Sequence, residues 1–148
     1  MASTLATLRD LIVDHLKVQP WASANGITVI ARKKGVTGAK LREMVQGLHA
    51  PGIIVFLPTP RGCNANLTVG SPVDLSVEMQ VVEYASVNKS ALEADDVAIL
   101  CLRALWGWTP VSPDWPIAPE PIPLIPGEAE SPFIINILMT TTGTLEIS

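Results

Sequence analysis

The sequence predicts an α+β fold: a chiefly antiparallel β-sheet of about four strands, helices packed on one face of the sheet, and a proline-rich extended arm. Apolar residues recur at helical spacing in residues 3–17 and are nearly continuous between the helix caps of residues 90–108. Residues 72–84 alternate between apolar and polar, and eight of the thirteen prolines fall within residues 109–132. Alternation is typical of a strand with one buried face, and proline cannot donate to a sheet ladder. The 148 residues are expected to form one domain, residues 1–148, with the arm inside it.

Residues 90–108 predict the helix around which the fold is organised. Ser90 and Glu93 match an S-x-x-E capping box, Arg103 stands near the other end, and Gly107 suits a left-handed stop. Almost every residue between these signals is apolar. We therefore expect the helix to be buried on more than one face, with its core side chains at Val97, Leu100, Cys101 and Leu105.

Residues 3–17 predict an amphipathic helix at the start of the chain. Arg9 falls on its wet side, and His15 is interpreted as an ordinary surface histidine. Pro20 is expected to stop this helix. The apolar residues of its buried side recur every three or four positions, at Leu5, Leu8, Ile12 and Leu16.

Shorter segments connect the two helices. Residues 21–26 predict a turn, residues 27–31 a short β-branched strand, and residues 37–49 a further helix. The basic loop between the strand and that helix is interpreted either as a solvated turn or as a contact with phosphate or an acidic partner. Its cations are Arg32, Lys33 and Lys34.

Three segments supply the remaining strands. Residues 53–57 are uninterrupted apolar residues, so we expect a central strand covered on both faces. This strand and residues 72–84 predict a hairpin whose tip is the long loop of residues 59–72. Residues 133–142 predict another apolar strand.

Composition and charge favour self-association. Apolar residues make up 48% of the chain and charged residues only 16%, which suits either a permanent subunit interface or a merely apolar monomer. Residues 1–72 carry eight Lys/Arg and three Asp/Glu (+5), and residues 73–148 carry two and eleven (−9), which together give the net charge of −4. This asymmetry fits a head-to-tail ring, a nucleic-acid patch, or loops that simply differ in composition.

No pattern in the sequence indicates catalysis. The two cysteines, Cys63 and Cys101, have no metal or redox spacing and are expected to be free thiols of a reducing compartment. A nucleophile pair of Cys63 and His49 lacks a marked group to orient the imidazole. We expect no export signal, because no cationic start is followed by an apolar run, and no uncharged run reaches membrane-spanning length. We expect no enzyme activity, no cofactor and no metal site.

Residues 81–110 resemble a known family. A strand ending Val81-Val82-Glu83-Tyr84 is followed by Asn88 and a long Ala/Leu helix, which closes with Leu105-Trp106-Gly107-Trp108-Thr109-Pro110. This arrangement is similar to the tail terminator proteins of tailed bacteriophages, also called tail completion or minor tail proteins. In that family the helix commonly closes with a Leu-His-Gly-Trp signature, and here Trp106 stands where the histidine does.

The resemblance implies a structural virion protein with an α+β fold. Such proteins form a hexameric ring at the head-proximal end of the tail tube, end tube polymerisation and join the tail to the head connector in the neck. Its implied partners are copies of itself, the tail tube protein and connector proteins, with genomic DNA passing through the lumen and no membrane. It would be assembled in the host cytoplasm and located in the virion.

The resemblance also implies which residues make contacts. Subunit contacts are expected at Arg32, Lys33, Lys34, Trp108, Trp115 and Ile117, and tail-tube contacts in the hairpin loop at Arg61, Asn64, Asn66 and Leu67. Another neck or head-closure protein, a nucleic-acid-binding module and an undetected small enzyme are the alternatives.

Overall fold

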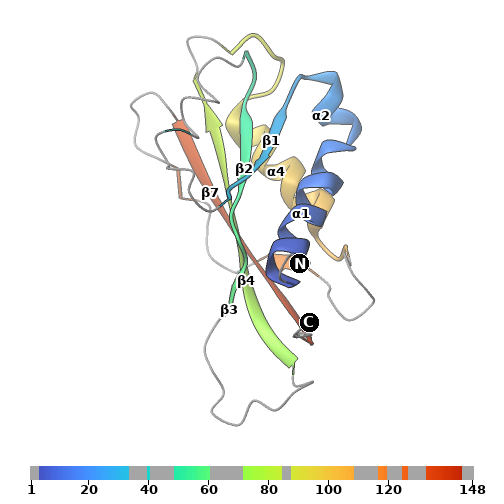
Figure 1. Cartoon of the computed structure of the whole chain (residues 1–148). Helices are drawn as coiled ribbons and strands as arrows, with labels where there is room; N and C mark the ends of the chain where they lie inside the picture. Colours follow the sequence, from blue (N-terminus) through green and yellow to red (C-terminus); the bar gives the residue numbers. More distant parts are fainter. Residues whose placement is uncertain are drawn as a thin grey trace.

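The computed structural model describes residues 4–33, 40, 49–60, 72–84, 88–108, 117–119, 125–126 and 133–144. Its helices and strands build one mixed sheet with helices packed against it (Figure 1). The predicted α+β class is confirmed. In chain order the elements are α1 (Thr4–Lys17), α2 (Pro20–Ala24), β1 (Thr28–Ala31), β2 (Gly52–Val55), β3 (Thr59–Pro60), β4 (Pro72–Glu83), α4 (Ala94–Leu105), β5 (Ile117–Pro119), β6 (Ile125–Pro126) and β7 (Phe133–Thr144).

The sheet has four principal strands in the order β1-β2-β4-β7. The first pair is parallel and the other two are antiparallel, which confirms a chiefly antiparallel sheet. Strand β2 lies between β1 and β4 with all four residues buried, as expected for a central strand. The longest ladder joins β4 to β7 over all twelve residues of each strand, from Pro72 opposite Thr144 to Glu83 opposite Phe133.

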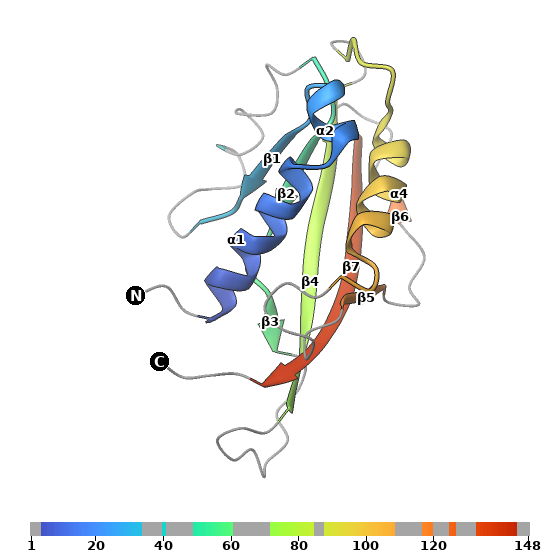
Figure 2. The same cartoon turned by 90° about the vertical axis from the view of Figure 1, so that its right-hand side faces the viewer.

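The core fills the space between the sheet and two helices. Helices α1 and α4 both cover the face of the sheet that is turned toward the viewer in Figure 2. Leu75, Val77, Met79 and Val81 of β4 point into this core and are fully buried, as the alternation predicts. Removing apolar surface from water contributes about 25 cal/mol per Å², and this is the main free energy that holds the helices on the sheet. The helices contribute Leu8, Ile12, Val13, Leu16, Ala94, Val97, Ala98, Cys101 and Leu105.

The opposite face of the sheet is part apolar and part polar. Ile54 and Val82 are buried there, and Ile30, Phe56, Tyr84 and Ile134 pack around them. Next to this cluster, Gln80 Nε2 donates to Asn136 Oδ1 at 3.0 Å across the β4–β7 ladder. The alternation along β4 therefore separates a dry face from a mainly polar one.

One predicted turn is instead a short helix. Residues 21–26 were expected to form a turn, but most of them belong to α2, which has Gln19 as its N-cap and Pro20 at its first position. Proline is favoured at that position because its missing N–H is not needed there. By contrast, the prediction that Pro20 stops the first helix is confirmed, because α1 ends at Lys17.

Several predicted segments lie largely or wholly outside the described residues. They are the helix of residues 37–49 and residues 61–71 of the hairpin loop. Of the proline-rich arm, the structure describes two short strands, β5 and β6, and both pair with β7. The arm as a whole stays a prediction. Within the described part of the chain, no helix has the length and apolar character needed to cross a membrane.

Candidate assembly surface

The start of α4 is held by a capping box one turn later than predicted. The box joins Glu93, the N-cap, to Asp96, whose Oδ2 accepts from Glu93 N at 3.0 Å. Ser90 instead belongs to a turn of its own, because its amide donates to Asn88 Oδ1 at 2.9 Å and its hydroxyl lies 2.7 Å from the same oxygen. Asparagine and serine compete with helix formation through such local bonds, so the helix begins only after them.

A buried carboxylate ties this helix start to the sheet. Glu83, the last residue of β4, is only 8% exposed. Its Oε1 accepts from Ala94 N at 3.3 Å, and its Oε2 accepts from Asn88 Nδ2. Asn88 Nδ2 also donates to Leu92 O at 2.9 Å. The sequence shows Glu83 and Asn88 within the family-like segment, but spacing alone did not predict that they meet.

One face of α4 is buried and the other is open. Val97, Cys101 and Leu105 are fully buried, whereas Leu100 is half-buried, so only three of the four residues expected in the core of this helix lie there. Ile99 is 46% exposed and Trp106 67% exposed. The expectation that the helix is buried on more than one face is therefore wrong for the single chain.

The C-terminal end of α4 turns back against α1. Gly107 adopts a positive φ of 75°, as predicted for a left-handed stop. Trp108 then stacks on His15 with ring centroids 3.9 Å apart and an interplanar angle of 10°. His15 Nε2 also lies 3.0 Å from Ala104 O. The interpretation of His15 as an ordinary surface histidine is wrong, because its ring joins the two helices.

These contacts show which side of α4 faces away from α1. Successive helical residues are about 100° apart around the axis. Asp95, Ile99 and Trp106 are therefore each about half a turn from Ala104, on the side opposite His15. Leu102, which is half-buried, borders them. We call Asp95, Ile99, Leu102 and Trp106 the outer flank of α4.

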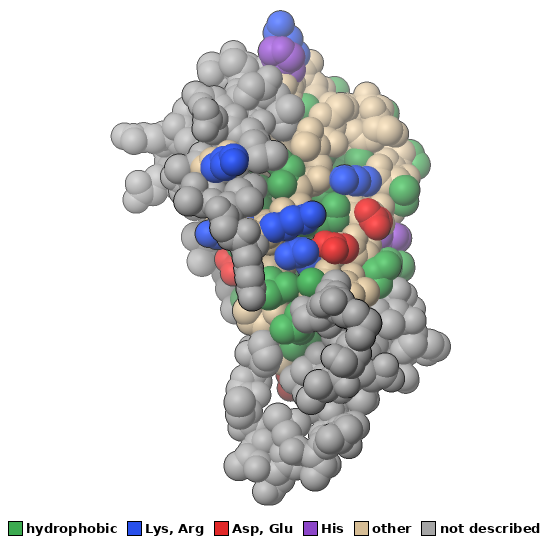
Figure 3. Space-filling model, in the orientation of Figure 1, with side chains coloured by type: hydrophobic (Ala, Val, Ile, Leu, Met, Phe, Trp, Pro, Cys, Tyr) green, Lys and Arg blue, Asp and Glu red, His purple; other side chains and the backbone are tan. Residues whose placement is uncertain are grey.

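Two exposed cations lie beside β1, at the edge of the sheet farther from α4. Arg32 and Lys33 directly follow β1 and are both exposed; we call this pair the basic edge. The Arg32 guanidinium lies 5.2 Å from the centroid of the Phe56 ring, a cation–π distance. Figure 3 shows Lys and Arg side chains near the middle of the visible face, with Asp or Glu side chains beside them.

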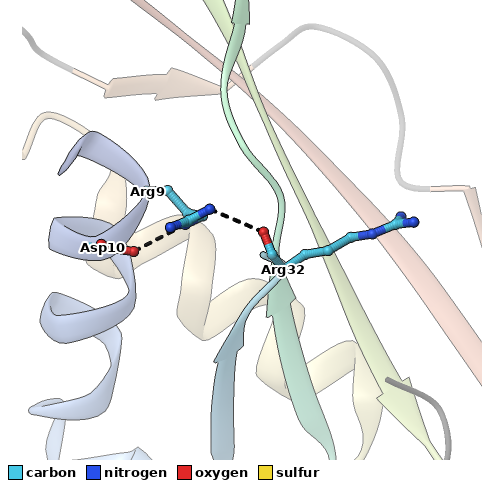
Figure 4. A network of polar contacts seen from close by, with 3 residues as sticks. All are labelled: Arg9, Asp10 and Arg32. Atoms are coloured by element: carbon cyan, nitrogen blue, oxygen red, sulfur yellow. Dashed lines mark hydrogen bonds and ion pairs between the residues drawn. The ribbon is translucent and has the colours of Figure 1, made fainter. Parts of the chain in front are cut away.

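Arg9 supports the backbone of the basic edge. It was expected on the wet side of α1, but only 8% of it is exposed. Its Nε donates to Asp10 Oδ1 at 3.0 Å and its terminal nitrogen donates to Arg32 O at 3.1 Å (Figure 4). The Arg32 side chain points away from this contact, so its charge stays available at the surface.

Of the remaining predicted contact residues, only Trp108 and Ile117 lie in the described part of the chain. Trp108 is half-buried and packs within its own chain, and Ile117 pairs with Thr141 through β5. The other residues expected at subunit or tube contacts lie outside the described part: Lys34, Trp115, Arg61, Asn64, Asn66 and Leu67.

A pocket of about 530 Å³ lies where residues 24–26, 49–50 and 89–91 meet. Lys89 N donates to His49 O at 2.7 Å, so backbone pairing joins two of these segments.

Over the described residues, no group of three or more His, Cys, Asp or Glu side chains is placed to hold a metal ion. No known family model matches the chain, and no curated protein matches it.

Proposed function

We propose that this chain is a structural virion protein of a tailed phage that forms a ring at the head-proximal end of the tail tube. In this role it ends tube polymerisation and joins the tail to the head connector. The outer flank of α4 is the single observation that carries the proposal, because it exposes Ile99 and Trp106 on the helix that also bears the family-like ending at residues 105–108.

The exposure of Trp106 has a direct physical consequence. A large aromatic side chain that is 67% exposed leaves apolar area in water, and tryptophan is among the residues that contribute most to binding at protein interfaces. Ile99 lies on the same flank and enlarges the apolar area. Contact with a second copy would remove both side chains from water, which supports permanent self-association.

The shape of the sheet supports a separate contact with the tube. The start of β4 and the end of β7 extend past the lower end of α1 in Figure 2. The predicted tube-contact loop, with Arg61 and Asn64, connects β3 to β4 at that end of the sheet. A two-stranded extension of this kind can reach a neighbouring protein while the helices remain free for subunit contacts.

The test is the size and symmetry of the purified chain. We expect six-fold rings by negative-stain electron microscopy and a hexamer mass by light scattering. Replacing Ile99 and Trp106 together by Gln should weaken ring formation by at least about tenfold, because a buried aromatic anchor such as Trp106 contributes about 2 kcal/mol.

Val18→Gln is the matched control, because Val18 is 75% exposed and lies outside the outer flank. This variant should form rings like the parent chain. A parent chain that stays monomeric at all concentrations would refute the proposal. Rings of another copy number, located between the tube and the connector in virions, would indicate a head-closure protein instead.

A further inference from the structure

We propose that the copies join head to tail, with the outer flank of α4 in one copy docked on the basic edge of the next. The occupant of the flank is thus a second copy of this chain. The inference rests on the proposed function only in requiring that copies associate, and it names the two surfaces that meet.

The outer flank of α4 and the basic edge lie near opposite edges of the sheet. Helix α4 packs against β4, β7 and β5, whereas α1 packs against β1 and β2. The strand order runs β1-β2-β4-β7-β5, so the basic edge and α4 are separated by the width of the sheet. Two different surfaces at opposite sides of one protomer make a heterologous contact, which closes into a ring when the rotation between copies allows it.

The charges of the two surfaces are complementary. Glu93, Asp95 and Asp96 are all exposed at the start of α4, and Arg32 and Lys33 are exposed at the basic edge. This distribution follows the sequence, in which residues 1–72 are net positive and residues 73–148 net negative. Opposite potentials orient the encounter, and like charges oppose a contact between two flanks or between two basic edges.

The apolar groups are complementary as well. Trp106 and Ile99 on the flank need an apolar partner, and Phe56 is half-buried beside the basic edge with Arg32 above its ring. An arginine held over one aromatic ring can receive a second ring on its other face. Asp95 lies on the same flank and can pair with Lys33 of the neighbouring copy.

The test reverses charge on each surface in the full chain. Asp95 is chosen over Glu93 and Asp96 because those two form the capping box. Asp95→Lys and Lys33→Glu should each raise the ring dissociation constant by about tenfold at low salt, since attraction is replaced by repulsion. Lys17→Glu reverses an exposed charge in the last turn of α1, about 12 Å along the helix from Arg9, and should leave the constant unchanged.

Rescue identifies the pairing. The double variant with Asp95→Lys and Lys33→Glu in one chain should regain the parent affinity. An equimolar mixture of the two single variants should also form rings, because alternating copies then meet with opposite charges at every contact. A contact between identical flanks predicts no rescue by the double variant.

The outcomes separate this inference from the proposed function. Parent rings that neither single reversal weakens would overturn the pairing and leave the ring intact. A parent chain without rings would refute the proposed function itself. A Lys33→Glu variant that keeps its rings but loses salt-sensitive binding of duplex DNA would assign the basic edge to nucleic acid instead.

Discussion

The thiol of Cys101 lies on the buried face of α4. Burial raises the pKa of Cys101 from 9.0 to about 12, because the thiolate loses its hydration there. The folded chain therefore keeps a proton that the unfolded chain releases between these values. Because of this difference, the free energy of unfolding keeps its full value below pH 9.0 and falls as the pH rises toward about 12.

Thiol titration checks this environment. In a Cys63→Ser background at about pH 8, we expect no reaction of Cys101 with a disulfide reagent in native buffer and complete reaction in urea, since only the thiolate attacks. Rapid modification of the native protein would show that the thiol is reachable and contradict the burial.

Arg9 and His15 show where reasoning from residues ends. Helical spacing placed both away from the core, and neither sequence position carries a signal of its partner. Arg9 is buried where its guanidinium donates to the carbonyl of Arg32, and His15 is half-buried because the turn at Gly107 brings Trp108 onto its ring. Both partners are distant in the chain, so these two contacts form only when the helices lie on the sheet.

At the scale of elements, the link between β4 and α4 depends on Glu83. We predict that Glu83→Ala destabilises the fold by about 1–3 kcal/mol, because the amides of Ala94 and Asn88 lose their acceptor in a buried site. Urea unfolding followed by far-ultraviolet circular dichroism measures this change. Glu78→Ala, an exposed change on the same strand, should shift stability by less than about 0.5 kcal/mol.

Strongly patterned elements were predictable, and the two-residue strands were not. The alternation of β4, the apolar run of β2 and the helical spacing of α1 each predict an element from the pattern of its own residues. By contrast, β3 and β6 have two residues each and exist only by pairing with longer strands. The capping box was misplaced because Ser90 and Glu93 fit the S-x-x-E pattern, whereas the box that forms has Glu93 at the N-cap and Asp96 at N3, which that pattern does not describe.

At the scale of the whole molecule, the open flank of α4 couples stability to concentration. If copies associate through it, raising the protein concentration tenfold should raise the thermal midpoint by several degrees, because mass action stabilises the bound state. The variant with Gln at positions 99 and 106 should lose this dependence, and Val18→Gln should keep it. Equal midpoints for the parent chain at both concentrations, measured by calorimetry, would contradict self-association.

The register of the β4–β7 ladder predicts the order in which its residue pairs form during folding. Its nearest partners in the chain, Glu83 and Phe133, are separated by α4 and the proline-rich segment, so closing the first pair costs loop entropy before many contacts form. Later pairs then form in sequence away from the helices, toward Pro72 and Thr144. We expect the projecting end to pair last and to fray first, so a neighbouring protein that contacts it would stabilise the residue pairs that open most often in the free chain.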